Sequence, residues 1–332
     1  LRSIHAGYNV LGDKPMVIVP ADLAKIELAF AEAKKRGLLL YDIMTERPET
    51  TTILQRELSR MPEVFGTLLT GSAEQPAITK ESVHHYCKTV SGKPLQRPPW
   101  FFDVTQQGEG IVDVTTHLVD LVQWEAFPEQ ILTPADVKVL AARRWTTKVS
   151  AAQFEKSTGL KGFPAFNKSR VTAGGELEVY GNGEFSYTLR GVHAKVSVTW
   201  NFEAPEGGGD THYSIMRGSS ANLIIRQGKE QSYKPVLYVE NSGPATAPNF
   251  EKSLLSAITK LQSLYPGLTI KPAASAWEIV VPDTFKIGHE AHFAQVTAKY
   301  LKYLADGKLP EWEEPNMLTK CHTIIEAYRM SR

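Results

Sequence analysis

The feature that most constrains the fold is a strand–helix–strand–helix series in the first 60 residues. An apolar run at residues 8–11 ends at a Gly-Asp-Lys-Pro corner, and residues 20–36 carry an amphipathic helical pattern. Residues 38–44, LLLYDIM, are a continuous apolar run, typical of a strand buried on both faces of a parallel sheet. A second helix is expected over 48–60. The series predicts a right-handed parallel crossover, and its two strands need more sheet than the residues before them supply.

From residue 64 the pattern becomes rich in β-structure. Residues 64–73 are expected to form a strand, 74–110 a loop-rich segment and 111–124 a helix. Residues 175–191 read as a hairpin, because Gly-Asn-Gly allows positive φ at a tight turn. Residues 192–204 alternate apolar and polar side chains, which predicts an antiparallel strand with one buried face.

The chain ends in helices separated by short strands. Helices are expected over 250–263, 289–306 and 316–330, with LTIKP and WEIVVP as strands between them. The sequence therefore predicts an α/β segment followed by an α+β domain with an open, mainly antiparallel β-sheet covered by helices.

Composition excludes several classes of partner. The net charge is +1, from 37 basic and 36 acidic residues, which gives no overall attraction to nucleic acid or to an anionic membrane. No apolar run approaches the ~18 residues of a membrane span. Cys87 and Cys321 lack a metal-site spacing, so no metal is expected. A cytoplasmic location is expected; a periplasmic or secreted one stays open, because the chain begins at Leu1 rather than at a methionine.

One stretch of the 111–124 helix carries a candidate catalytic constellation. Asp113 and His117 are at i, i+4, and Asp120 lies near the same face. A carboxylate beside an imidazole orients the ring and raises its basicity, which suits a general base near neutral pH. The alternative is a solvated helix face with an ordinary stabilising pair.

Two further residues are candidates for a ligand site. Lys14 follows a strand end, where open α/β sheets bind ligands, and can stabilise developing negative charge on an oxygen. Trp100, in RPPWFFD, can stack on a sugar ring, although a buried loop plug is equally compatible with the sequence. The alternative for Lys14 is a surface lysine at a turn.

Other polar clusters are expected to have structural rather than catalytic roles. His84 and His85 are expected on an irregular segment, and residues 141–148, AARRWTTK, on a basic surface turn that could instead hold an anion. The histidines of GHEAH at 288–292 are at i, i+3 rather than the zincin spacing, which favours a structural or substrate-pocket role.

Two segments together resemble the Gfo/Idh/MocA oxidoreductase family, the relatives of glucose-fructose oxidoreductase and inositol dehydrogenase. AGYNVLGDKPM at 6–16 is similar to the family's AGKHVxxEKPxA, and DVTTHLVD at 113–120 is similar to its DxxxHxxD, beginning 99 residues after Lys14. The resemblance implies that residues 1–63 are the C-terminal remnant of a dinucleotide-binding Rossmann domain. Residues 64–332 would then be the substrate and oligomerisation domain of a divergent branch.

The resemblance also implies a mechanism. His117 would take a proton from a substrate hydroxyl, Lys14 would assist the proton relay, and Asp113 would hold a hydroxyl and orient His117. Lys14 and Pro15 would lie against the nicotinamide of NAD or NADP, with Asp113, His117, Asp120 and Trp100 around a sugar, polyol or derivative.

Two departures from the family pattern affect the cofactor. Asp13 replaces the usual glutamate before the lysine, and no G-x-G-x-x-G is present to hold a pyrophosphate. We therefore expect this chain to bind NAD(P) weakly or not at all, with the cofactor bound by a longer protein.

Other functions remain open at this point. The first is a non-catalytic carbohydrate-binding or oligomerisation module of the same fold, and another is a hydrolase or lyase. The apolar face of residues 192–202 is expected to exceed what the chain's own helices cover. A homo-oligomer through that sheet face is therefore expected, with a sugar-like small molecule as the other partner.

Overall fold

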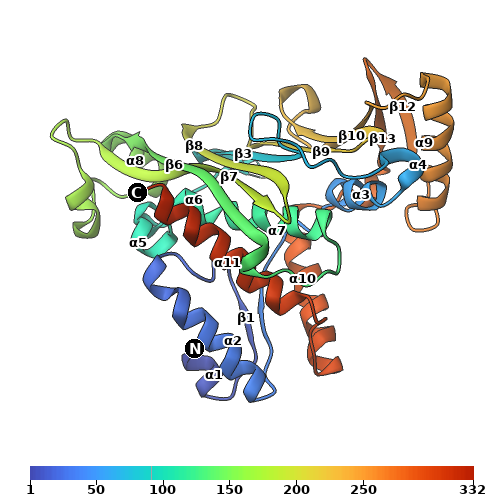
Figure 1. Cartoon of the computed structure of the whole chain (residues 1–332). Helices are drawn as coiled ribbons and strands as arrows, with labels where there is room; N and C mark the ends of the chain where they lie inside the picture. The colour runs from blue at the N-terminus through green and yellow to red at the C-terminus, as the bar shows by residue number, and fades with distance from the viewer. Residues whose placement is uncertain (91) are drawn as a thin grey trace.

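The N-terminal segment folds as a parallel β–α–β unit. The structure, a computed structural model, describes residues 1–90 and 92–332. Helix α1 (Arg2–His5) precedes β1 (Val10–Gly12), and α2 (Leu23–Lys35) leads to β2 (Leu40–Asp42). Strands β1 and β2 pair in parallel with Gly12 opposite Asp42, and α2 follows a short 3-10 turn. The predicted parallel crossover is therefore present, and it projects below the rest of the molecule (Figure 1).

A nine-stranded sheet forms the body of the protein, in the order β12-β13-β11-β10-β9-β3-β8-β7-β6. Its strands are β3 (Ile78–Cys87), β6 (Val137–Val149), β7 (Leu177–Leu189), β8 (Val192–Glu203), β9 (Thr211–Arg217), β10 (Ala221–Gln227), β11 (Val236–Asn241), β12 (Thr269–Ala273) and β13 (Ala276–Val280). Every neighbouring pair is antiparallel except β3 and β8, which run in parallel. The sheet is therefore mixed, although mainly antiparallel as expected.

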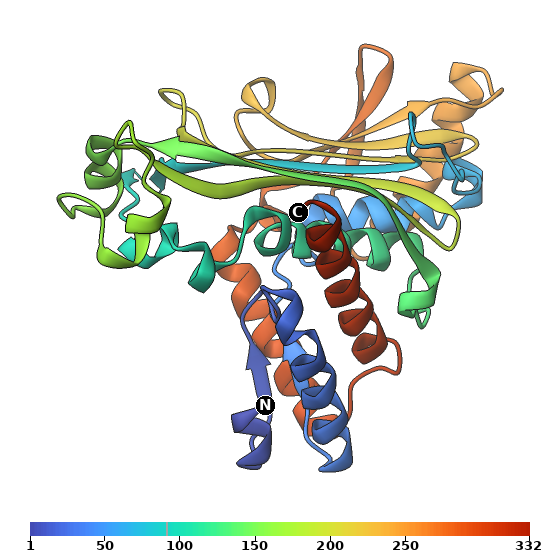
Figure 2. The same cartoon turned by 60° about the vertical axis from the view of Figure 1, so that its left-hand side comes forward.

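The helices after β2 cover the face of the sheet that is turned toward the N-terminal unit, flank the ends of the sheet or run beside that unit (Figure 2). They are α3 (Thr50–Ser59), α4 (Pro62–Phe65), α5 (Val104–Gln107), α6 (Gly110–Asp113), α7 (Thr115–Ala126), α8 (Ala151–Thr158), α9 (Ala247–Leu261), α10 (His289–Asp306) and α11 (Glu313–Met330). A two-stranded hairpin, β4 (Thr89–Val90) and β5 (Lys93–Pro94), lies outside the sheet. Among the described residues, no helix combines the length and the apolar character that crossing a membrane requires.

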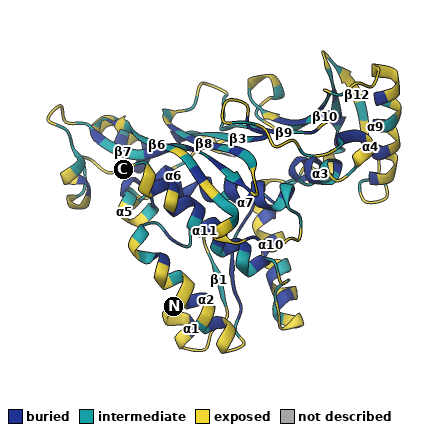
Figure 3. Cartoon of the chain, viewed as in Figure 1, coloured by how far each residue is buried: buried dark blue, intermediate teal, exposed yellow. Residues whose placement is uncertain are grey.

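The side-chain pattern of strand β8 explains why helices pack on this face of the sheet. Its burial alternates as predicted: Val196 and Val198 are fully buried, while Ser197 and Thr199, which follow them in turn, are partly exposed. Helices α6 and α7 pack on the buried side. The chain's own helices therefore cover the apolar side of β8, which the burial colours follow along the strand (Figure 3). A homo-oligomer through the sheet stays a prediction.

The structure corrects the prediction for residues 64–110. Residues 64 and 65 end the short helix α4 instead of beginning a strand, and β3 crosses the centre of the sheet where loops were expected. Strand β3 was missed because its inward positions include Lys80, which is buried against Glu125 at 2.7 Å. His84 and His85 lie on this strand, and both contact Asp210 rather than projecting from an irregular segment.

The Gly-Asn-Gly sequence at 181–183 is not a turn, because β7 continues through it, with a register shift against β6 beside Asn182. A Cβ at Gly183 would lie 2.4 Å from Ile111 Cβ, and a Cβ at Gly110 would lie 1.6 Å from Gly181 O. The glycines thus let α6 rest directly on the strand. Asn182 remains in the strand and donates to Trp145 O and Thr147 Oγ1.

The basic stretch 141–148 also lies within a strand, β6, rather than on a turn. Arg143 is paired with Glu184 at 2.7 Å, and Arg144 contacts both carboxylate oxygens of Glu109 at 2.6 Å. These arginines are therefore used in ion pairs within the fold.

The N-terminal unit shares its hydrophobic core with the end of the chain. Phe30, Leu40 and Tyr41 pack with side chains of α10 and α11, among them Tyr300 and Met317. A separate and larger core lies between the sheet and its helices. The last two helices therefore join the two parts of the molecule.

Candidate functional site

The candidate site begins where Lys14 meets Asp113. Lys14 lies two residues beyond the carboxyl end of β1, and Asp113 is the last residue of α6. Lys14 Nζ donates to Asp113 Oδ1 at 2.8 Å, and Gln107 Nε2 donates to Asp113 Oδ2 at 3.0 Å. The Lys14 side chain is 23% exposed and that of Asp113 is 5% exposed. The structure thus brings together two predicted site residues that are 99 positions apart.

Local sequence explains why Asp113 lies there. Gly110 of α6 lies directly against Gly181 of β7, so the helix packs closely on the strand. Ile111 and Val112 of the same helix are fully buried. Asp113 then lies at the end of this short helix, toward the N-terminal unit. Gln107 was not singled out from the sequence, because its contact depends on the turn between α5 and α6.

His117 occupies the first turns of α7, but it does not contact Asp113. The predicted helix is broken at Val114, between α6 and α7, so the expected i, i+4 contact is lost. Instead, both oxygens of Asp113 accept hydrogen bonds from Lys14 and Gln107. Asp113 therefore does not orient the His117 ring as predicted, because the helix is broken between them.

The His117 ring has unused hydrogen-bonding capacity. Its Nδ1 is buried without a hydrogen-bond partner within the described ranges. Burial, and next the Lys14 ammonium, hold the pKa of His117 well below its ordinary value, so the ring is neutral at neutral pH. A neutral imidazole with a free nitrogen is able to accept a proton.

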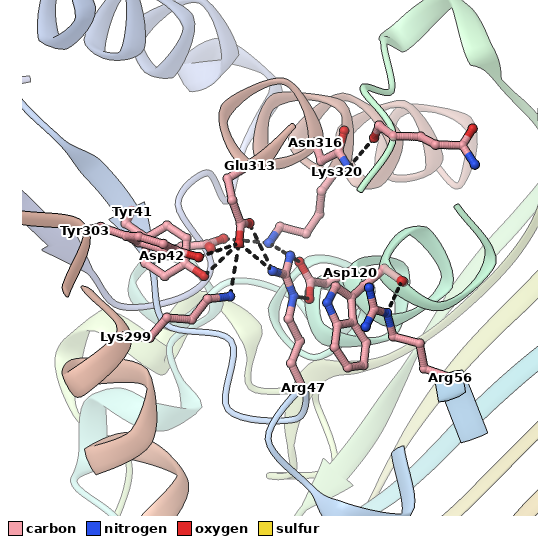
Figure 4. A network of polar contacts seen from close by, with 12 residues as sticks. Tyr41, Asp42, Arg47, Arg56, Asp120, Lys299, Tyr303, Glu313, Asn316 and Lys320 are labelled. Carbon is pink, nitrogen blue, oxygen red and sulfur yellow. Dashed lines mark hydrogen bonds and ion pairs between the residues drawn. The ribbon is translucent and has the colours of Figure 1, made fainter. Parts of the chain in front are cut away.

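Asp120 lies one turn after His117 and is part of a buried ion-pair network (Figure 4). Arg47 Nε and Nη2 donate to its two oxygens at 2.6 and 2.8 Å, and Lys320 Nζ donates to Oδ1 at 3.0 Å. Burial alone would raise the pKa of Asp120, but Arg47 and Lys320 outweigh it and hold that pKa below its usual range. With both oxygens occupied, Asp120 is poorly placed to bind a substrate, contrary to expectation.

The network continues into the helices at the end of the chain. Arg47 Nη1 also contacts Glu313 Oε1 and Oε2 at 3.1 and 2.9 Å, and Lys299 donates to Glu313 Oε1 at 3.1 Å. Lys320 contacts Asp42 Oδ2 at 2.6 Å. Sequence reasoning missed these residues, because nothing in their local patterns indicates partners up to 278 positions away.

Trp100, His289 and His292 make no hydrogen bond to Lys14, Asp113 or His117 within the described part of the chain. Trp100 is 45% exposed on a 3-10 turn over residues 99–102. Pro15 follows Lys14 through a cis peptide bond. His289 and His292 begin α10, and His292 is 4% exposed with neither ring nitrogen hydrogen-bonded. In residues 1–90 and 92–332, no three side chains gather in a way that could hold a metal ion.

Chemically, the arrangement offers a cation, a carboxylate and a neutral base near one another. The Lys14 ammonium is able to share its donors between Asp113 and a ligand oxygen. The unpartnered nitrogen of His117 is able to take the proton of a ligand hydroxyl. These groups suit chemistry at a carbinol or carbonyl carbon.

Comparison with known proteins agrees with this chemistry. A family profile described as "Putative oxidoreductase C terminal domain" matches residues 54–332. A solved structure described as a "putative oxidoreductase" from Parabacteroides merdae is 52% identical, with a TM-score of 0.96 over 99% of this chain and 75% of that chain. No curated protein sequence matches the chain.

More distant structures share the fold. KijD10, a 3-ketoreductase from Actinomadura kijaniata, is 15% identical with a TM-score of 0.54, over 99% of this chain and 72% of that chain; its structure is a complex with TDP-benzene and NADP. A levoglucosan dehydrogenase in complex with NADH and L-sorbose is 12% identical with a TM-score of 0.60, with the same shares covered. At these identities the likeness concerns the fold alone.

Proposed function

The chain belongs to the Gfo/Idh/MocA type of oxidoreductases, and on that premise we propose that Lys14, Asp113 and His117 form the substrate side of a nicotinamide-dependent redox site. The profile match includes residues 113–120, and the Parabacteroides merdae structure covers 99% of this chain. The proposed substrate is a sugar, polyol or derivative. In this proposal residues 1–63 serve the cofactor side and residues 64–332 the substrate side.

The observation that carries the proposal is the Lys14–Asp113 hydrogen bond at 2.8 Å. It joins the carboxyl end of a parallel strand, where α/β folds bind ligands, to the helix that precedes His117. An unrelated surface lysine and a solvated helix face would have no reason to meet in a partly buried contact.

The proposed chemistry divides the work between these residues. A bound nicotinamide supplies the hydride acceptor or donor. During oxidation of a carbinol, His117 takes the hydroxyl proton on a ring nitrogen, and its low pKa keeps that nitrogen free beforehand. Lys14 donates a hydrogen bond to the same oxygen as negative charge develops on it, and Asp113 with Gln107 holds Lys14 in place. Reduction of the ketone reverses these proton movements.

The residues present fit the nicotinamide end of a cofactor better than its pyrophosphate. Lys14 and Pro15 would flank the nicotinamide, beside the unpartnered His117 nitrogen. The turn between β1 and α2 carries prolines at 15 and 20 rather than a glycine-rich phosphate loop. We therefore propose that this chain alone binds NAD or NADP weakly.

A sugar-like substrate is supported by the distant structural neighbours. One of them is a dehydrogenase of levoglucosan, with L-sorbose in its structure, and another is a 3-ketoreductase with a TDP derivative. They also differ in cofactor, NADH in one and NADP in the other. Both cofactors are therefore included in the test.

The test is hydride transfer by a protein that joins residues 1–332 to a complete dinucleotide-binding domain, at saturating NAD or NADP, monitored at the nicotinamide absorbance with a panel of sugars and polyols. The expected result for His117→Asn is a loss of turnover of about 100-fold or more, since a positioned general base contributes on that order. His322→Asn is the matched control, because His322 lies at the surface against Glu27 and should keep full activity.

Turnover retained by His117→Asn would remove His117 from the proposal. If that protein binds NAD or NADP and no member of the panel is oxidised or reduced, yet a sugar binds saturably, the chain is a carbohydrate-binding module of this fold, and the redox proposal is wrong.

A further inference from the structure

His117 lies between two cationic bridges that tie the N-terminal unit to the helices under the sheet. The first is Lys14 to Asp113, four residues before His117. The second runs from Asp42 through Lys320 to Asp120, three residues after it. The segment that carries the imidazole is therefore held at both ends.

Both bridges begin at the same edge of the small parallel sheet. Gly12 at the end of β1 pairs with Asp42 at the end of β2, and Ile43 N donates to Gly12 O at 3.0 Å. Lys14 follows Gly12 by two residues. The second bridge thus connects α7 to the same strand ends from which the Lys14 segment continues.

Arg47 makes the second bridge rigid. Its guanidinium contacts Asp120 with two nitrogens and reaches Glu313 with a third, so that α7 and α11 share one planar donor. The Arg47 side chain is 8% exposed, and those of Asp120 and Lys320 are 2% and 1% exposed. Such a forked contact leaves little freedom for the first turns of α7.

The composition of the network argues against a purely stabilising role. Asp42, Asp120 and Glu313 face Arg47, Lys299 and Lys320, so the charges balance. Burying charged groups is expensive, and apolar residues of similar volume often do as well for stability. What the ion pairs add is a defined geometry.

We infer that Lys320 and Arg47 are positioning residues for His117, which hold α7 through Asp120 so that the imidazole faces the Lys14 side of the site. This inference rests on the proposed role of His117. Neither positioning residue touches the substrate in this scheme.

The charged groups around His117 give the inference a measurable consequence. Lys14 follows β1, Asp113 ends α6, Asp120 shares α7, His289 begins α10 and Lys320 lies on α11. After burial, Lys14, Lys320 and His289 lower the pKa of His117, whereas Asp120 raises it. Removing the Lys320 charge should therefore raise the pKa of His117.

The test is a titration of the His117 imidazole by nitrogen-15 NMR in this chain. Lys320→Met should move the titration upward by about half a pH unit to one unit, since a nearby buried charge shifts a pKa by that order or more. Lys320→Arg keeps the charge and should restore most of the original value. Lys302→Met is the matched control, because Lys302 pairs with Asp306 at the surface.

A double variant, Lys320→Met with Asp42→Asn, removes one charge of each sign and preserves the balance if the single variant fails to fold. It should show the same upward shift. A second readout is kinetic: we expect kcat to fall about tenfold in Lys320→Met, with KM changed by less than about twofold, as for a displaced base.

A His117 titration that is identical in the wild type, Lys320→Met and the double variant would overturn the inference, and stability loss alone would not support it. The NMR result does not depend on turnover. If His117→Asn remains active while the titration shifts, the redox role of His117 fails, whereas its electrostatic coupling to Lys320 stands.

Discussion

At the scale of single residues, the His117 imidazole is held in a state that folding does not favour by itself. A buried polar nitrogen without a partner costs about 1–3 kcal/mol. His292 has the same property, since neither ring nitrogen is hydrogen-bonded in the described part of the chain, although Glu49 Oε2 lies 3.8 Å from Nε2. Such groups in a native structure call for an explanation, and a catalytic role or a bound water or ion are among those known.

The buried histidines predict how stability depends on pH. Burial is the main reason that the pKa values of His117, His212 and His292 lie below the ordinary 6.5, with His212 at about 3. Above pH 6.5 the folded and unfolded chains both hold these rings neutral. Below it the unfolded chain binds protons that the folded chain does not, so the free energy of unfolding should fall as the pH drops.

The expected slope is at most about 1.4 kcal/mol per pH unit for each histidine. Urea unfolding at a series of pH values between 7 and 5 measures it, and His212→Gln should make the dependence shallower. A free energy of unfolding that stays constant over this range would contradict the prediction.

At the scale of elements, the glycine contact between α6 and β7 controls where Asp113 lies. Gly110→Ala would place a methyl group 1.6 Å from Gly181 O, which forces helix and strand apart. We expect a loss of roughly 1–3 kcal/mol in the free energy of unfolding, together with a weakened Lys14–Asp113 contact.

Gly174→Ala is the control, since a Cβ there would lie 3.7 Å from Thr172 Oγ1, an ordinary contact. Its effect should stay within about 0.5 kcal/mol. Chemical denaturation measures both variants, and equal stabilities would show that the backbones separate at little cost.

Local patterns predicted some elements well and others not at all. The α2 stripe, the burial alternation of β8 and the last three helices depend on side-chain periodicity, which the sequence contains. Strand β3 depends on a buried Lys80–Glu125 pair, and β7 on a helix that packs on its glycines. These causes lie far along the chain, so no local pattern reveals them.

The same reasoning applies to the candidate site. Lys14, Asp113 and His117 were found because their motifs carry chemistry in short segments. The break at Val114 and the partners of Asp120 were not found, because each depends on tertiary contacts. Motifs therefore supplied the candidate residues, while the contact between Lys14 and Asp113 and the partners of Asp120 had to come from the structure.

At the scale of the whole molecule, the N-terminal unit is not independent of the rest. Its core contains Tyr300, Tyr303 and Met317 from α10 and α11, and Arg47 links it to Asp120 and Glu313. We therefore expect urea unfolding to give one transition, with coincident midpoints by tryptophan fluorescence and far-ultraviolet circular dichroism. An earlier, separate melting of the β1–β2 amides in hydrogen exchange would contradict this.

The place of β3 in the sheet has a consequence for how the chain is made. β3 leaves the ribosome first among the nine strands, yet its two neighbours, β8 and β9, begin only at residues 192 and 211. Antiparallel pairing can join β6 to β8 and β9 to β11 as each group is synthesised, but these are separate halves until β3 enters between them. In the nascent chain both edges of β3 therefore stay unpaired until β8 and β9 have been synthesised. Completing the sheet is a late step between segments far apart in sequence, and aggregation can compete with it.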